Sequence, residues 1–126
     1  MANRAFAVIY SSSVAAAEAF YASLGFQETA RMPDDGEPGY VSLRRGDAEL
    51  GIVSTEWPRQ ELGLQIGDGA RFEMYIYVDD VNAVLAEHPD TRFREARDMP
   101  WGERVGYLRD PDGNLVALAQ TGAEVG

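Results

Sequence analysis

The residues of this chain that are best suited to chemistry stand in one short stretch, FEMYIYV, which begins at Phe72. Glu73, Tyr75 and Tyr77 alternate within it, so a β-strand would place all three side chains on one face. A carboxylate beside phenols can orient a cationic or amine group, and it can also take part in acid–base chemistry. Tyrosine rings stack on planar molecules and donate hydrogen bonds. The same rings would equally well pack the core of a sheet, and the sequence leaves both interpretations open.

Residue types that make reactive or metal-binding sites are scarce in this chain. It has no cysteine, which excludes disulfides, thiolate nucleophiles and zinc–thiolate sites. Its only histidine, His88, directly precedes Pro89, where a helix is expected to end. We therefore interpret His88 as a solvated loop residue rather than as a metal ligand.

Length, composition and charge restrict the class of protein. A chain of 126 residues is long enough for one domain with a sizeable core. No run approaches the roughly 18 apolar residues that cross a bilayer, and the stretch MANRAFAVIYSSS is too short for a signal peptide, so we expect a cytoplasmic protein without membrane partners. The net charge of −10 argues against a nucleic acid partner. It suits a cationic ligand, although an acidic surface that only serves solubility explains it too.

Alternation of apolar residues predicts four strands in each half of the chain. In the first half they are expected over residues 5–10, 27–32, 40–44 and 48–54. In the second half they are expected over residues 72–78, 92–97, 104–109 and 115–119. The RDPDGN stretch before the last strand has the residue types of a tight turn.

Helical spacing predicts one helix in each half. The first is expected from Val14 to a stop at Gly25, with one of the three preceding serines as its N-cap. The second is expected between a cap at Asp79 or Asp80 and Pro89. Each half thus has the order strand, helix, strand, strand, strand.

This order is an internal repeat, because aligning Val14 with Val81 superimposes the two halves. We therefore predict a single α+β domain built of two tandem βαβββ modules, at about residues 4–55 and 70–122. The Trp-, Pro- and Gly-containing residues between them lack periodicity and are expected to form a loop. Two such modules can form curved mixed sheets around a cleft, with the helices on the outside.

Four segments carry a resemblance to a known family: AFYASLGF, LRRGDAELGIV, FEMYIYVDDV and PWGERVGYLRDPDGNLVALAQ. In this order and spacing they resemble the glyoxalase, bleomycin resistance protein and extradiol dioxygenase superfamily, also called vicinal oxygen chelate proteins. The resemblance covers nearly the whole chain. It implies paired modules and a homodimer, often with strands or modules exchanged between subunits. It also implies, for the enzymes of the family, a divalent metal held by His, Glu or Gln in the cleft.

The positions of this chain that correspond to the family's metal ligands are Phe6, Gly51, Glu73 and Ala117. Only Glu73 has a side chain that can coordinate a metal. A catalytic site for Zn, Fe, Ni or Mn needs about three protein ligands. We therefore predict no bound metal and no other cofactor.

The faces that carry these positions are expected to line an aromatic, mostly apolar pocket. The predicted lining is Phe6, Val8, Tyr10, Gly51, Glu73, Tyr75, Tyr77, Leu115, Ala117 and Ala119. Trp57 and Trp101 stand in loops flanked by Gly or Pro, where they bind a ligand, contact a second subunit or anchor the loop. Arg104 is expected to stack on an aromatic ring or to hold Glu73, unless it is an ordinary surface arginine. The predicted ligand-binding residues are Phe6, Val8, Tyr10, Trp57, Glu73, Tyr75, Tyr77, Trp101, Arg104 and Ala117.

These features predict a metal-free, dimeric small-molecule binding protein of the bleomycin resistance type, which sequesters an antibiotic or metabolite. One alternative is an enzyme of the same superfamily, either a glyoxalase-like lyase or isomerase, a thiol transferase or a dioxygenase. It would need an atypical metal site or metal-free acid–base chemistry by Glu73 and a tyrosine. A second alternative is a regulatory or assembly protein with an empty cleft.

Overall fold

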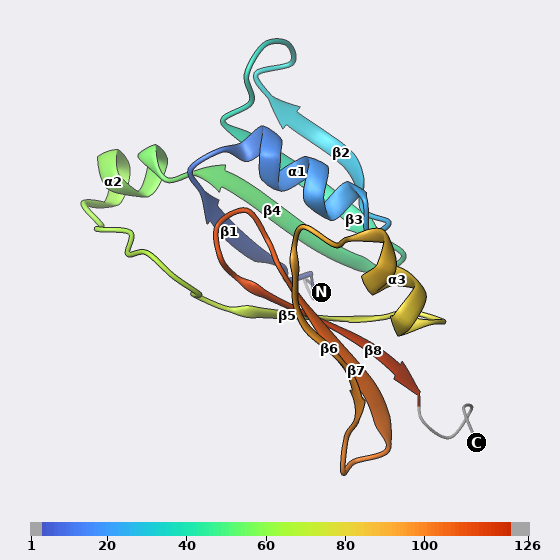
Figure 1. Cartoon of the computed structure of the whole chain (residues 1–126). Helices are drawn as coiled ribbons and strands as arrows, with labels where there is room; N and C mark the ends of the chain where they lie inside the picture. The colour runs from blue at the N-terminus through green and yellow to red at the C-terminus, as the bar shows by residue number, and fades with distance from the viewer. Residues whose placement is uncertain (1–3, 122–126) are drawn as a thin grey trace. The chain divides into compact units, whose positions relative to one another are not determined.

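The computed structural model describes residues 4–121, which form two four-stranded sheets and three helices (Figure 1). The chain divides into two compact units at the boundary between Gly67 and Asp68, and each unit holds one of the sheets. Within each unit the elements follow one another as strand, helix, strand, strand, strand. The predicted α+β class with two tandem βαβββ modules is therefore confirmed.

The first unit is a mixed sheet with one face covered by a helix. Its elements are β1 (Ala7–Ser11), α1 (Val14–Ala22), β2 (Gln27–Met32), β3 (Tyr40–Arg45), β4 (Ala48–Ser54) and α2 (Glu56–Leu62). The strand order is β1-β4-β3-β2, in which β1 runs parallel to β4 and the other pairs are antiparallel. Helix α1 lies across the strands of this sheet, while α2 follows the end of β4 (Figure 1).

The second unit repeats this topology. Its elements are β5 (Glu73–Tyr77), α3 (Val81–Glu87), β6 (Arg92–Asp98), β7 (Glu103–Arg109) and β8 (Leu115–Thr121). The strand order is β5-β8-β7-β6, and β5 runs parallel to β8. In both sheets, therefore, the last strand of the module is hydrogen-bonded between the first strand and the third.

Helices α1 and α3 begin where the sequence predicts. The Ser13 hydroxyl accepts a hydrogen bond from the Ala16 amide at 3.3 Å and caps α1. The Asp80 carboxylate accepts one from the Ala83 amide at 3.1 Å and caps α3. Each bond satisfies an amide that the helix itself leaves without a partner. Among residues 4–121 we find no helix with the length and apolar character needed to cross a membrane.

The core of the first unit lies between α1 and the sheet. Ile9, Ile52 and Val41 stand side by side on β1, β4 and β3, and all three are buried. The fully buried Tyr21 of α1 meets the ring of Phe20 edge-on, with ring centroids 5.0 Å apart. Each buried apolar side chain of this kind contributes about 1.5–3 kcal/mol. The opposite face of the sheet is not covered by α1, and it carries the site described below.

The predicted turn before the last strand is confirmed. Asp110 is buried, and its Oδ1 accepts hydrogen bonds at 2.9 Å from the amides of Asp112 and Asn114. Gly113 closes the turn with a φ of 86°, a conformation that glycine adopts without strain. The Asn114 side chain accepts a further hydrogen bond from the Arg71 amide at 2.9 Å. The turn thereby fixes the approach of the chain to β5 as well as the start of β8.

The expectation of an irregular connection after β4 is wrong for its first part, because residues Glu56–Leu62 form helix α2. Trp57 therefore lies in a helix and not in a loop. Pro58 sits in the first turn, where its missing amide costs no hydrogen bond, and Gly63 ends the helix with a φ of 66°. Seven residues with one proline are too few to show a helical period. Trp101 does lie in a loop, between β6 and β7.

Substitution of Gly106 by alanine tests the close packing of α3 on β7. A Cβ atom at Gly106 would lie 2.6 Å from Leu85 Cδ1 and 3.3 Å from Val81 Cγ1, both of which are buried. We expect Gly106→Ala to lower the free energy of unfolding by about 1–3 kcal/mol, because a packed interior does not accept an extra methyl group. Urea unfolding followed by circular dichroism measures the change.

The matched control is Gly67→Ala, since a Cβ atom at Gly67 would meet nothing within 4 Å. This variant is expected to unfold at the urea concentration of the parent protein. An equal loss of stability in both variants would contradict the packing argument.

Candidate functional site

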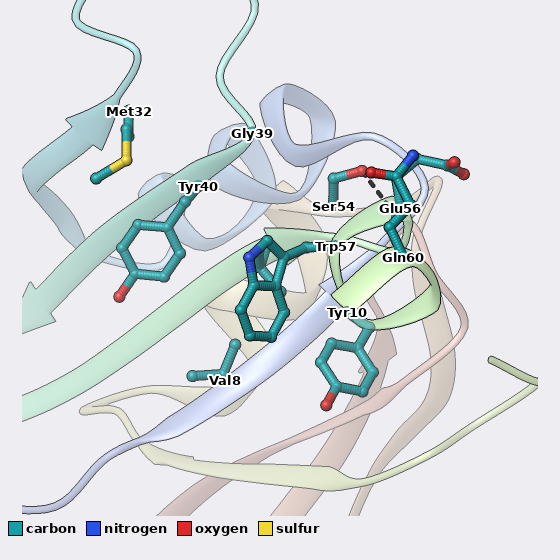
Figure 2. Close-up of a pocket in the computed structure, with 10 residues that line it drawn as sticks. Val8, Tyr10, Met32, Gly39, Tyr40, Ser54, Glu56, Trp57 and Gln60 are labelled. Atoms are coloured by element: carbon teal, nitrogen blue, oxygen red, sulfur yellow. Dashed lines mark hydrogen bonds between the residues drawn. The ribbon is translucent and has the colours of Figure 1, made fainter. Parts of the chain in front are cut away.

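The open face of the first sheet forms a pocket of about 620 Å³. Strands β1, β3 and β4, the end of β2 and helix α2 contribute its walls. Its lining residues are Val8, Tyr10, Met32, Gly39, Tyr40, Val53, Ser54, Glu56, Trp57 and Gln60. Figure 2 shows the Trp57 ring directed among Val8, Tyr10 and Tyr40. The pocket thus unites three predicted ligand-binding residues, Val8, Tyr10 and Trp57, within one unit.

Strand alternation explains which side chains reach this face. In β1, Ile9 is buried under α1, so Val8 and Tyr10 point to the opposite side of the sheet. Tyr10 and Tyr40 are both register partners of Val53, from opposite sides of β4. The two phenol rings therefore flank the same residue of the central strand.

Gly51 makes room for a wall of the pocket. A Cβ atom at Gly51 would lie 2.9 Å from Tyr40 Oη and 3.3 Å from Val8 Cγ2. The Tyr40 hydroxyl accepts a hydrogen bond from Ser42 Oγ at 2.9 Å, which holds the ring in this place. The position that carries a metal ligand in the enzymes is therefore covered here by a tyrosine ring.

Helix α2 presents Trp57 to the pocket. The amide of Glu56 donates to Ser54 Oγ at 3.2 Å where β4 passes into the helix (Figure 2). Pro58 is fully buried and anchors the helix, whereas Trp57 remains 51% exposed. Arg59 forms an ion pair with Glu56 at 3.3 Å. Because both charged groups are exposed, this pair contributes little to stability, and the apolar indole is the main feature that the helix adds.

A second cluster of predicted residues lies in the second unit, around a carboxylate that the sequence analysis missed. The Tyr75 hydroxyl and the Trp101 indole Nε1 donate to Glu103 Oε1 at 3.1 and 3.0 Å. The Tyr77 hydroxyl donates to Glu103 Oε2 at 2.5 Å. We call Tyr75, Tyr77, Trp101 and Glu103 the Glu103 cluster. A sequence signal did exist, because Glu103 stands only two residues after Trp101 at the start of an expected strand.

Small residues of β8 allow this cluster to form. Ala117 and Ala119 are the register partners of Tyr75 and Tyr77, and they are fully buried. Strands β5 and β7 are about 10 Å apart with β8 between them. Only a short side chain on β8 lets a tyrosine of β5 reach Glu103 of β7 across the sheet.

The hydrogen bonds shift the pKa values of the cluster in opposite directions. The bond to Glu103 raises the pKa of Tyr77, while burial, followed by the bond to Glu103, raises the pKa of Tyr75. The bonds that Glu103 accepts, that of Tyr77 first, lower the pKa of its carboxyl. At neutral pH the carboxylate is therefore charged and the phenols keep their protons. Such groups bind well but exchange protons poorly, since efficient acid–base catalysis needs pKa values close to the working pH.

The remaining predicted residues lie outside these two groups of side chains. Glu73 is exposed at the start of β5. Arg104 forms an ion pair with Asp98 at 2.8 Å, so the expectation that it holds Glu73 is wrong; strand alternation turns it away from the Glu103 side of β7. Phe6 precedes β1 and has the guanidinium of Arg4 4.9 Å from its ring centroid.

Leu115, Ala117 and Ala119, which belong to the second unit, are not among the lining residues of the pocket in the first unit. Ala117 and Ala119 form a buried cluster with Val105, against which Met99 and Tyr107 pack. Leu115 is half-buried at the start of β8. Ala117 is therefore a spacer under larger side chains, and its direct contact with a ligand stays a prediction.

The residues at the four family metal positions do not fit a metal ion. Phe6, Gly51 and Ala117 have no donor atom in their side chains, and only Glu73 offers a carboxylate. In the part of the chain from residue 4 to residue 121, no three His, Cys, Asp or Glu side chains stand together as a ligand set. Nδ1 of His88 lies 2.9 Å from the Val84 carbonyl oxygen at the end of α3. The donor atoms at these four positions therefore do not make up the ligand set that a metalloenzyme needs.

Comparisons with known proteins agree with this framework. Residues 4–118 match the family described as the Glyoxalase/Bleomycin resistance protein/Dioxygenase superfamily. The comparison with curated proteins gives no match.

Solved structures with a similar fold include both binding proteins and enzymes. One is a bleomycin-binding protein complexed with bleomycin (22% identity, 95% of this chain and 99% of that chain covered, TM-score 0.63). Another is a bleomycin resistance determinant encoded on the transposon Tn5 (23% identity, 95% and 98% covered, TM-score 0.63). A third is a glyoxalase-related enzyme from Fulvimarina pelagi (16% identity, 95% and 89% covered, TM-score 0.78). At these identities the likeness shows the fold alone.

The substitution Glu103→Gln tests the hydrogen bonds of the cluster. Glutamine keeps the size of the side chain but removes the negative charge that favours the protonated phenols. We expect the pKa of Tyr77 to fall toward the ordinary tyrosine value, and that of Tyr75 to fall as well. Carbon NMR of protein labelled at tyrosine Cζ, recorded through an alkaline titration, measures both.

The control is Glu95→Gln, which removes one exposed carboxylate from β6 in the same unit. It is expected to leave both tyrosines as in the parent protein. If Tyr77 titrates identically in the parent and in Glu103→Gln, the cluster does not exist in solution.

Proposed function

Because the chain belongs to the Glyoxalase/Bleomycin resistance protein/Dioxygenase superfamily, we propose that it binds a small antibiotic or metabolite and acts by sequestration, without a metal. The observation that carries this proposal is the aromatic pocket of the first unit, with Trp57 exposed over Val8, Tyr10 and Tyr40.

The size and lining of the pocket suit a planar, partly aromatic molecule. A volume of about 620 Å³ lies within the range of ordinary small-molecule sites, roughly 300–1,000 Å³. Tyr10, Tyr40 and Trp57 offer ring faces for stacking and polar edges for hydrogen bonds. Glu56 and Gln60 add polar groups on the side of α2. A ligand is therefore held by apolar contact and oriented by a few polar atoms.

The comparisons support the same class of function. One structural neighbour is a bleomycin-binding protein in complex with its drug, and another is a bleomycin resistance determinant. Binding of bleomycin is a property of those proteins, and for this chain they support only a ligand of the same general kind. The homodimer that the family resemblance implies stays a prediction.

Sequestration is favoured over catalysis by the chemistry of the side chains. Three of the four family metal positions lack a donor atom, so the metal chemistry of the enzymes has no ligand set here. Metal-free acid–base catalysis by the Glu103 cluster meets a second difficulty, because the pKa of Glu103 is lowered and those of Tyr75 and Tyr77 are raised. Both shifts move the groups away from neutral pH.

Removal of the Trp57 ring tests the pocket. A thermal-shift screen with bleomycin, related glycopeptide antibiotics and aromatic natural products is expected to find a compound that raises the melting temperature, because binding to the native state stabilises it. For that compound we expect Trp57→Ala to weaken binding by about 10- to 30-fold, as is common for an aromatic side chain that the ligand covers. Isothermal titration calorimetry measures the loss.

The matched control is Leu62→Ala, which removes an exposed apolar side chain from the same helix but outside the pocket lining. Its affinity for the compound is expected to equal that of the parent. A screen without any stabilising compound, or equal affinity of Trp57→Ala and the parent, would refute the proposal.

Metal uptake provides a separate test. Protein freed of metals with a chelator is incubated with Zn, Ni, Mn or Fe(II), separated from unbound ions and analysed by inductively coupled plasma mass spectrometry. We expect less than one ion in ten chains, since one carboxylate cannot hold a divalent ion against water. One tightly held ion per chain would show that other residues build a site and would favour the enzyme alternative.

A further inference from the structure

The carboxylate of Glu103 is held differently from the acidic side chains that form ion pairs. Glu49 pairs with Arg4 and Asp98 pairs with Arg104. Glu103 instead receives its hydrogen bonds from two phenols and one indole, and among residues 4–121 it has no ion pair. Its negative charge is therefore left without a positive partner in this part of the chain.

The aromatic side chains of the cluster turn their polar edges to Glu103 and leave their rings accessible. Tyr75, Tyr77 and Trp101 are all exposed, and Trp101 retains 59% of its accessible surface. The rings of Tyr75 and Tyr77 have centroids 5.7 Å apart and are tilted by 54°. Two inclined ring faces and a third exposed ring therefore surround one charge. Ring faces are the negative part of an aromatic quadrupole and attract cations.

We propose that Tyr75, Tyr77, Trp101 and Glu103 form a binding site in the second unit for an alkylated ammonium group of a small molecule. This inference goes beyond the function proposed above, which rests on the pocket of the first unit.

The hydrogen-bond capacity of Glu103 indicates why the cation is alkylated. A carboxylate accepts about four hydrogen bonds, and the cluster already supplies three. A primary ammonium with three N–H groups would need more acceptors than remain. A methylated or quaternary ammonium needs few or none, and it gains from ring faces and from the charge. A metal ion is disfavoured as well, because it requires several donor side chains and the cluster has one carboxylate.

The protonation states of the cluster agree with this geometry. The lowered pKa of Glu103 keeps its carboxylate charged at neutral pH, and the raised pKa values of the two tyrosines keep them neutral donors. The net charge of −10 further favours the approach of a cation.

The two tryptophans provide separate reporters, since Trp57 belongs to the pocket of the first unit and Trp101 to the Glu103 cluster. Uniformly ¹⁵N-labelled full-length protein gives one indole N–H signal for each, assigned with Trp57→Phe and Trp101→Phe. Choline is the probe, and 3,3-dimethyl-1-butanol, its uncharged isostere, is the ligand control. We expect choline to shift the Trp101 signal in a saturable titration and to leave the Trp57 signal in place. The uncharged isostere should shift neither.

Three carboxylate variants then assign the charge. Glu103→Gln is expected to raise the dissociation constant of choline about tenfold or more, whereas Glu95→Gln, on the exposed β6, should leave it unchanged. A dispersed amide spectrum shows that each variant is folded. The proposal is wrong if the Trp101 signal does not move, if the isostere acts like choline, or if Glu73→Gln weakens binding as much as Glu103→Gln does.

These outcomes are independent of the proposed function. Failure of choline to shift Trp101 removes the ammonium site but leaves the pocket of the first unit untouched, and loss of an aromatic ligand on Trp57→Ala supports that pocket whatever choline does.

Discussion

The arrangement of the aromatic side chains on both sheets depends on a small residue within the last strand of each module. This strand is hydrogen-bonded on both sides, and neighbouring strands are only about 4.8 Å apart, so a long side chain there would fill the space above the sheet. Gly51 and Ala117 leave that space open. Tyr40 lies over Gly51, and Tyr75 and Tyr77 reach across β8 to Glu103. The small residues at these two positions therefore make room for aromatic side chains.

The acidic side chains of this protein are held in different ways. Glu49, Glu56 and Asp98 are paired with arginines at the surface, where an ion pair contributes little. Glu103 is held by neutral donors, which stabilise its anion without cancelling its charge. The tyrosines that donate these bonds become weaker acids. A site of this kind has strong polarity and little capacity to move protons, and that combination is typical of recognition rather than of catalysis.

Much of the fold and part of the site follow from local patterns of the sequence. Ser13 and Asp80 cap the helices, and Gly113 closes the turn before β8, because each of these features depends on only a few consecutive residues. The repeat of strands and helices predicts two equal modules for the same reason. Strand alternation also places Val8 and Tyr10 correctly on the open face of the first sheet, since a period of two needs no knowledge of the neighbouring strands.

The tertiary structure alone decided which side chains meet. Trp57 enters a pocket because it lies in a helix that is anchored by the burial of Pro58. With seven residues, this helix is too short for its period to be visible in the sequence. Glu103 becomes the centre of a cluster because the pairing of three strands puts it on the same face as two tyrosines, which reach it diagonally over small residues of β8. Arg104 pairs with Asp98 because the register of β6 and β7 places the two residues opposite each other. Periodicity along one strand fixes the face of a side chain, but its partner depends on strands distant in sequence, and no local pattern encodes that register.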